Sequence, residues 1–229
     1  MVSISTRLEQ VRTRIAAACT AAQRPAGDVT LLAVSKTFGA DAVREAHAAG
    51  QRAFGENYIQ EALAKIESLA DLRAQLHWHL IGPIQSNKSR AVAENFDWVH
   101  AVDRLKIAQR LSDQRPDHLP PLQVCLQVNI SGEASKSGLA PAEVAGVAKA
   151  VAALPRLRLR GLMAIPEPAG DIEAQRVPHR ALHALFERLR ADGLPLDTLS
   201  MGMSADLEAA IAEGATLVRV GTAIFGGRG

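Results

Sequence analysis

Cysteine is scarce in this sequence of 229 residues. Only Cys19 and Cys125 are present, and their separation in the chain matches neither a metal-binding nor a redox motif. The two cysteines therefore give no basis for a disulfide framework or a metal site. We expect two reduced thiols, in or near the core of a cytoplasmic protein, because disulfides are rare in that compartment.

Long apolar runs and blocks of like charge are also missing. No run reaches the roughly 18 apolar residues of a transmembrane helix, so we expect no membrane partner. The early residues Arg7, Arg12 and Arg14 are accompanied by Glu9 and lead into no apolar segment, which predicts a helix rather than a signal peptide. With 26 basic and 24 acidic residues the formal net charge is +2, so we expect no nucleic-acid partner.

Apolar residues, by contrast, make up 48% of the chain, which is enough for a large core. The length allows one domain of barrel size or two small ones. Because no linker, low-complexity tract or repeat divides the sequence, we predict a single domain over residues 1–229.

Strand and helix patterns alternate along the whole chain. After a first helix over 6–23, with Thr6 and Glu9 in a capping box, the predicted strands are 31–37, 51–55, 76–81, 98–102, 122–130, 157–165, 198–201 and 217–224. The predicted helices between and after them are 41–49, 58–69, one from about 86, 105–111, 141–154, 178–190 and 206–213. This alternation predicts an α/β fold of the (β/α)8 TIM-barrel class, preceded by an N-terminal helix. A doubly wound open sheet is the alternative, although no G-x-G-x-x-G follows the first strand.

Lys36 lies at the carboxyl end of the first predicted strand. The apolar run Leu31–Val34 ends at Ser35 and Lys36, which is the pattern of a buried strand. Burial disfavours the ammonium form of lysine and makes the amine available as a nucleophile for Schiff-base chemistry. Taken alone, however, a lysine that leaves the strand for solvent is the simpler interpretation.

The last two strands end in residues suited to phosphate. In a (β/α)8 barrel the active face lies at the carboxyl ends of the strands, where the last two loops often bind phosphate. Met203 and Ser204 lie in a glycine-containing loop that leads into a helix, and Gly221-Thr222 follows the eighth strand. Their backbone N–H groups and hydroxyls predict a phosphate site. The alternative is an ordinary helix cap at Ser204 and a plain turn at Gly221.

Arg219 is the lone charge in the apolar run 217–220 and shares the face of Gly221. It either lies in the barrel mouth, against a ring nitrogen or an acid, or pairs with an acid elsewhere. His77 and His79 form an H-x-H pair without further ligands at suitable spacing, so we expect no metal. A nucleophile elbow at Ser204 is rejected because Asp206 occupies the place of its second glycine.

Taken together, these segments resemble the pyridoxal phosphate homeostasis proteins. The matching motifs span nearly the whole chain in the family's order: Val34–Lys36, Phe54–Tyr58, His77–Lys88, Arg160–Ile165, Ser200–Ser204 and Arg219–Gly226. The resemblance implies a fold-type III barrel like the N-terminal domain of alanine racemase, with pyridoxal 5′-phosphate (PLP) as its cofactor. The residues that it implies for PLP binding are Lys36 as the Schiff-base lysine, Asn57 near the cofactor, Met203, Ser204, Gly221 and Thr222 at the phosphate, and Arg219 near the pyridine nitrogen.

The resemblance also implies a carrier rather than a catalyst. An arginine at the pyridine nitrogen leaves it unprotonated, which weakens the ring as an electron sink. Racemases place a tyrosine from a second domain opposite the lysine, whereas this sequence ends after the eighth strand and has only Tyr58. We therefore expect a non-enzymatic protein of intracellular PLP homeostasis, which holds PLP as a reversible Schiff base that is open to solvent or to another protein.

Several alternatives remain open at this point. A racemase-like PLP enzyme of the same fold is one, and a PLP-independent aldolase-type barrel that uses Lys36 is another. Apo PLP-dependent enzymes are the expected partners, and we expect a monomer or weak homodimer. Lys88 and Lys136 are candidates for a second PLP site.

Overall fold

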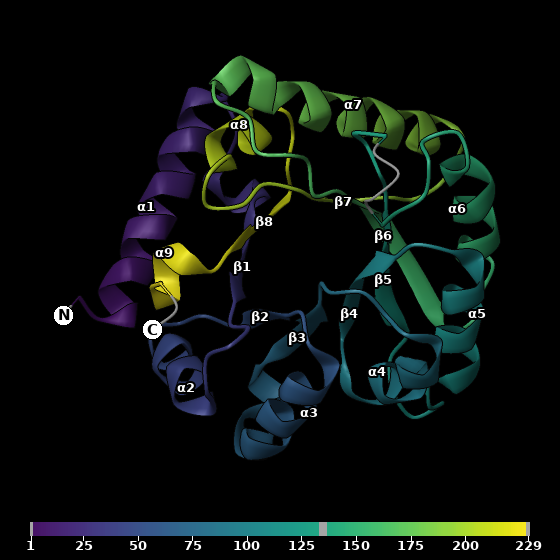
Figure 1. Ribbon diagram of the computed structural model, residues 1–229, viewed down its shortest axis with the longest axis horizontal. Coiled ribbons are helices and arrows are strands. Elements are labelled where there is room, and N and C mark those ends of the chain that lie inside the picture. The colour runs from purple at the N-terminus through teal and green to yellow at the C-terminus, as the bar shows by residue number, and fades with distance from the viewer. Residues whose placement is uncertain (1, 133–136, 228–229) are drawn as a thin grey trace.

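The computed structural model describes residues 2–132 and 137–227, and within them eight parallel strands close into a barrel in the order of the sequence (Figure 1). The strands are β1 (Thr30–Val34), β2 (Ala53–Glu56), β3 (His77–Leu80), β4 (Trp98–Val102), β5 (Leu122–Gln127), β6 (Leu157–Met163), β7 (Thr198–Ser200) and β8 (Leu217–Val220). Pairing of β1 with β8 closes the barrel, with Leu32 opposite Arg219. The predicted barrel fold is confirmed, and the open-sheet alternative is wrong.

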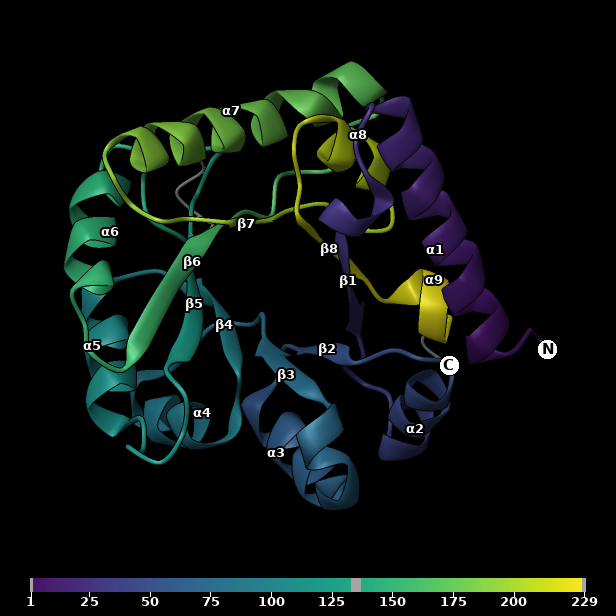
Figure 2. The ribbon, with the colours of Figure 1, turned by 180° about the vertical axis from the view of Figure 1, so that it is seen from behind.

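Helices surround this barrel on the outside, as both ribbon views show (Figures 1 and 2). They are α1 (Ile4–Ala21), α2 (Ala40–Ala48), α3 (Ile59–Ser68), α4 (Ser89–Asn95), α5 (Leu105–Gln114), α6 (Val144–Ala152), α7 (Ile172–Ala191), α8 (Leu207–Ala212) and α9 (Thr222–Phe225), with 3-10 turns at Ala26–Asp28, Ala70–Gln75 and Ser86–Lys88. The predicted N-terminal helix, α1, lies beside α8 and α9 on one side and α2 on the other. It therefore fills the place between the first and the last helices of the ring. Arg14 of α1 pairs with Glu208 of α8 there.

Several boundaries differ from the predictions, and three of them have a clear local reason. Helix α1 begins at Ile4 because the hydroxyl of Ser3, rather than that of Thr6, caps it. Helix α7 begins at Ile172, capped by Asp171, and continues through Pro178, where the prediction placed its start. The eighth strand ends at Val220, because the chain turns at Gly221 into the short helix α9 instead of remaining extended to residue 224.

The apolar core lies between the sheet and the helices, whereas the inside of the barrel is unusually polar. Trp78 and its outward-facing neighbours on the other strands are fully buried against helices. Inside, His100 on β4 hydrogen-bonds Ser200 on β7, two strands that do not pair. Such a contact is possible only across the barrel interior. Barrel interiors are more often filled by branched apolar side chains, so the polar filling here requires an explanation.

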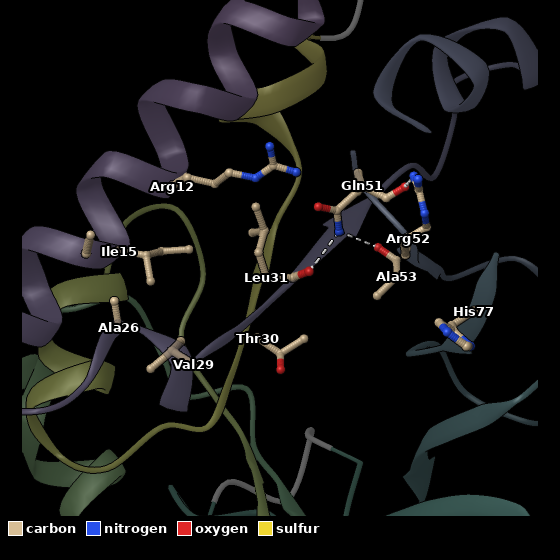
Figure 3. Close-up of a pocket in the computed structure, with 11 residues that line it drawn as sticks. Arg12, Ile15, Ala26, Val29, Thr30, Leu31, Gln51, Arg52, Ala53 and His77 are labelled. Carbon is tan, nitrogen blue, oxygen red and sulfur yellow. Dashed lines mark hydrogen bonds between the residues drawn. The ribbon is translucent and has the colours of Figure 1, made fainter. Parts of the chain in front are cut away.

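A cavity of about 500 Å³ lies at the amino ends of β1 to β3, under α1 (Figure 3). The Gln51 amide donates hydrogen bonds of 2.8 Å to the carbonyls of both Leu31 and Ala53 and thereby joins β1 to β2. Arg12, on the α1 side of the cavity, donates to the carbonyl of Ala49. The polar groups of this cavity therefore hold the framework together, and none of the predicted site residues lines it.

The two cysteines are free and buried, which agrees with the predicted core thiols. Burial raises the pKa of the Cys125 thiol to about 12. Within the described ranges no helix has both the length and the apolar character to cross a membrane.

Candidate functional site

At the carboxyl ends of the strands, a cavity of about 430 Å³ contains every residue predicted for the site. Its lining includes Lys36, Asn57, Met203, Ser204, Arg219, Gly221 and Thr222. They meet there because side chains alternate along a strand, so Lys36, Asn57, Arg219 and Gly221 all fall on the inward-facing positions of β1, β2 and β8 or of their extensions. Phe38, Ile81 and Ile165 complete much of the wall. The sequence did not single out these three residues.

The backbone around Lys36 is held on both sides by α3. Glu61 accepts a 2.6 Å hydrogen bond from the N–H of Thr37, and Lys65 donates a 2.8 Å bond to the carbonyl of Ser35. Thr37 has a φ of 68°, a conformation that β-branched residues rarely adopt. Such strain persists only where the surrounding structure enforces it. The half-buried Lys36 is therefore presented by a fixed, strained turn rather than by a mobile loop.

A buried ion pair supports this turn from below. Lys65 and Glu56 are almost fully buried and lie 2.6 Å apart, and the Ser35 hydroxyl donates a further 2.5 Å bond to Glu56. Burial raises the pKa of Glu56 above its ordinary value, against the opposing effect of Lys65. This pair was not predicted from the sequence, although a glutamate at the end of a buried strand and a lysine on the apolar face of the next helix are visible signals.

The Met203–Ser204 loop is fixed by a carboxylate. Asp206 accepts a 2.7 Å hydrogen bond from the N–H of Met203 and a 2.9 Å bond with the ring of His179 on α7. Gly202, which precedes the loop, has a φ of 92°, and a Cβ there would lie 2.5 Å from the Cβ of Ala210. The N-cap position of α8 is Asp206, so Ser204 lies in the preceding turn.

Backbone N–H groups remain available around this loop. Those of Ser204, Gly221 and Thr222 have no hydrogen-bond partner elsewhere in residues 2–132 and 137–227. A Cβ at Gly221 would lie 3.1 Å from the carbonyl of Val34, so a larger residue would push β8 away from β1. Unpaired N–H groups beside hydroxyls are the kind of group that binds anions in proteins.

Arg219 is buried, and no carboxylate hydrogen-bonds to it among the described residues. Its Nη1 donates to the carbonyl of Ser200 at 2.6 Å and to the hydroxyl of the same residue at 2.8 Å. Its Nη2 donates to the carbonyl of Ala164 at 2.8 Å. Burial lowers the pKa of Arg219 to about 10, and Asp206 opposes this effect at longer range. Of the two positions left open by the sequence, the structure selects the mouth of the barrel.

Asn57 reaches the cavity from the end of β2, and its Oδ1 is buried without a partner in the described structure. Its backbone is fixed by Gly82, where a Cβ would lie only 2.1 Å from the Asn57 carbonyl oxygen. A buried, unpaired amide oxygen costs about 1–3 kcal/mol unless a ligand satisfies it.

Other residues considered from the sequence lie elsewhere. His77 and His79 point to the amino end of the barrel, and the described residues contain no cluster suited to a metal ion. Lys88 lies in the turn Ser86–Lys88 and does not line the cavity, while Lys136 lies outside the described residues. Tyr58 is 53% exposed and does not line the cavity either.

Lys65→Met should destabilise the protein by roughly 3–5 kcal/mol, because it leaves Glu56 buried without its cation. A carboxyl whose folded pKa is raised stabilises most at low pH and loses that stability as pH rises through the folded pKa. The deficit should therefore be larger at about pH 8 than at about pH 5. Urea unfolding measures it.

The matched control is Lys149→Met on the exposed face of α6, which should change the free energy of unfolding by less than about 0.5 kcal/mol. Adding Glu56→Gln to Lys65→Met should restore part of the loss. Equal stability of the Lys65 and Lys149 variants at both pH values would refute a structural role for the pair.

Comparison with known proteins identifies the family of this chain. Residues 7–229 match the family model for the alanine racemase N-terminal domain. The pyridoxal phosphate homeostasis protein of Pseudomonas aeruginosa is 64% identical over 228 residues, which cover 100% of this chain and 97% of that protein. The corresponding protein of Escherichia coli K12 is 56% identical, with 100% and 98% covered.

Solved structures agree on the fold. PipY from Synechococcus elongatus, in a structure with PLP bound, is 39% identical with a TM-score of 0.85, covering 98% of this chain and 100% of that one. An alanine racemase from Clostridium difficile shares the fold at 14% identity, with a TM-score of 0.72 over 95% of this chain and 56% of the racemase. On the matched domain and on identity over its full length, this chain belongs to the pyridoxal phosphate homeostasis protein family, whose barrel is that of the alanine racemase N-terminal domain.

Proposed function

We propose that this protein binds PLP in the cavity at the carboxyl ends of the strands and serves intracellular PLP homeostasis by holding the cofactor as a reversible Schiff base. One observation carries the proposal. In the part of the chain that the structure describes, a half-buried amine, a set of unpaired backbone N–H groups and a buried guanidinium without a carboxylate partner line a single cavity of about 430 Å³. A small ligand with an aldehyde, a phosphate and an acceptor nitrogen uses all three.

Lys36 is the residue that we assign to the aldehyde. It is the one lysine among the described residues that line the cavity. The strained turn at Thr37 and its hydrogen bond to Glu61 restrict where the amine can go. A lysine on a rigid support loses less conformational freedom when it forms a covalent bond, which favours the bound state.

The phosphate fits the far side of the cavity. Ser204 and Thr222 offer hydroxyls there, Gly221 allows close approach of the backbone, and Met203 lines the same loop. Hydrogen bonds to a charged phosphate are each worth about 1.5–3 kcal/mol, so this group supplies much of the affinity.

The pyridine nitrogen fits Arg219, and Asn57 lies at the wall between Lys36 and the end of β3. A permanently charged donor stabilises an unprotonated ring nitrogen. PLP supplies an electron sink to enzymes when that nitrogen is protonated, so the environment here favours storage of the cofactor over carbanion chemistry.

The described lining of the cavity also offers no second acid or base. Among the described residues that line it, only Lys36 and Arg219 are ionisable side chains. Racemisation needs a proton donor on the face opposite the lysine, and a guanidinium does not perform this role at neutral pH. We therefore propose a non-catalytic carrier or buffer that releases PLP to apo PLP-dependent enzymes.

Lys36→Ala should abolish the visible absorbance band that added PLP gives with the wild-type protein, because the amine that forms the Schiff base is gone. Lys106→Ala, on an exposed position of α5, is the matched control and should keep the band. Absorbance spectra with added PLP decide the matter, and an unchanged spectrum in Lys36→Ala would remove Lys36 from the proposal.

Ser204→Ala and Thr222→Ala should each weaken PLP binding by about tenfold or more, since each removes a hydrogen bond to a charged phosphate. Pyridoxal, which lacks the phosphate, should bind these variants and the wild type with similar affinity. Equilibrium titration with both ligands separates the two cases, and equal losses for PLP and pyridoxal would argue against a phosphate site at this loop.

Single enantiomers of amino acids should remain unchanged when incubated with the PLP-loaded protein, because the described lining of the cavity contains no second acid or base. Chiral chromatography after long incubation measures the product. Turnover at the roughly 1–1,000 per second of typical enzymes would contradict the carrier function and indicate a racemase-like enzyme of the same fold.

A further inference from the structure

Four polar side chains form a continuous hydrogen-bonded chain through the inside of the barrel. The Nη1 of Arg219 lies 2.8 Å from the hydroxyl of Ser200, and that hydroxyl lies 2.8 Å from Nδ1 of His100. The Nε2 of His100 lies 2.9 Å from Nδ1 of His79. The chain connects β8, β7, β4 and β3 and runs from the ligand cavity toward the amino end of the barrel.

Arg219 fixes the direction of these hydrogen bonds. A guanidinium can only donate, so the Ser200 oxygen accepts from it. In the described structure, the remaining neighbour of that hydroxyl is His100, so the Ser200 O–H donates to Nδ1 of His100. His100 then carries its proton on Nε2 and donates it to Nδ1 of His79. Both histidines are thereby assigned the tautomer with the proton on Nε2.

The environment keeps both rings neutral. Burial, with the nearby charge of Arg219, lowers the pKa of His100 to about 3. Burial, followed by the effects of His100 and His77, lowers the pKa of His79 well below its usual range. A neutral imidazole retains one acceptor nitrogen, which the chain requires at both positions.

This chain leaves Arg219 with two unused donors. Of its five N–H groups, three bind the Ser200 carbonyl, the Ser200 hydroxyl and the Ala164 carbonyl. The Nε–H and the second hydrogen of Nη2 have no partner among the described residues, and Arg219 lines the cavity. Ser200 supplies two of the three anchors, so it contributes most to the orientation of the guanidinium plane.

We propose that Ser200 and His100 are positioning residues, which hold Arg219 so that its unused N–H groups face an acceptor nitrogen of the ligand ring. This inference rests on the proposed binding of PLP for the identity of the ligand. His100 acts through Ser200, because it accepts the hydroxyl proton and thereby directs the oxygen lone pairs toward Arg219. The chain makes the site selective for an unprotonated ring nitrogen over a ring that lacks this acceptor.

The first test needs no ligand. Long-range proton–nitrogen NMR of the 15N-histidine-labelled protein at neutral pH reports the tautomer of each ring. We expect His79 and His100 as neutral rings with the proton on Nε2. A proton on Nδ1 of His100 would overturn the proposed polarity, and this measurement holds even if a Ser200 variant does not fold.

The second test compares PLP with its 1-deaza analogue, in which a C–H group replaces the ring nitrogen. The wild-type protein should bind PLP about tenfold more tightly than the analogue, the gain of one charge-assisted hydrogen bond. Ser200→Ala should lose most of this preference. Thr198→Val is the matched control, because Thr198 lies two residues earlier on β7 and bonds to Asp197 instead of Arg219, so it should keep the preference.

The outcomes separate this inference from the proposed function. If the wild-type protein binds PLP and Ser200→Ala keeps the full preference over the deaza analogue, Ser200 does not position Arg219. If Ser200→Ala weakens both ligands by the same factor, its role is general packing and the inference fails. If the wild type binds neither ligand, the proposed function fails. The histidine tautomers then decide by themselves whether the hydrogen bonds from Arg219 to His79 have the proposed direction.

Discussion

The buried charge of Arg219 is the constraint on which the rest of the site depends. A guanidinium taken out of water without a carboxylate is destabilising by several kcal/mol unless other groups solvate it. Here two carbonyls and one hydroxyl do so in part, and they come from β7 and from the residue that follows β6. The polar interior of the barrel follows from this requirement, since the hydroxyl of Ser200 needs an acceptor of its own and finds it in His100.

The second buried cation near the site, Lys65, differs from Arg219 because carboxylates pair with it. Lys65 has a buried carboxylate, Glu56, at 2.6 Å and a second, partly exposed carboxylate, Glu61, at 3.2 Å. Its hydrogen bonds are complete within the protein, so it serves to hold the Lys36 turn. Among the described residues Arg219 has no such carboxylate partner, and two of its N–H groups have no hydrogen-bond acceptor there. A cation that is fully paired belongs to the framework, whereas one that is only partly satisfied is available to a ligand.

These two arrangements agree with a protein that holds a reactive cofactor. The Lys36 amine is supported by a strained turn, the proposed anion site by a loop that Asp206 braces, and the proposed ring site by the hydrogen-bonded residues behind Arg219. Hydrogen bonds within the protein support each of the three, and such preorganisation reduces the entropic penalty of binding. The same cavity has no second ionisable group suited to proton transfer among its described lining residues. Family membership and site chemistry therefore lead toward the same kind of function, binding and release.

The sequence and its family motifs predicted the barrel, the N-terminal helix and seven of the residues that line the cavity. Strand–helix alternation has few solutions, and the two-residue period of a strand places Lys36, Arg219 and Gly221 on one face at one end. Two element boundaries were predicted wrongly from local residue preferences. Pro178 lies inside α7 instead of at its start, and at Gly221 a turn replaces the predicted strand.

Only the tertiary structure decided which distant residues meet. His100 had no motif around it, and its link to Ser200 joins positions 100 residues apart that pair across the barrel rather than along the sheet. The hydrogen bonds of Glu61 and Lys65 to the backbone on either side of Lys36 likewise depend on how α3 packs against β1 and β2. Periodicity specifies the face on which a side chain lies, but hydrogen-bond partners across a closed barrel depend on strand register and stagger, which no local pattern encodes.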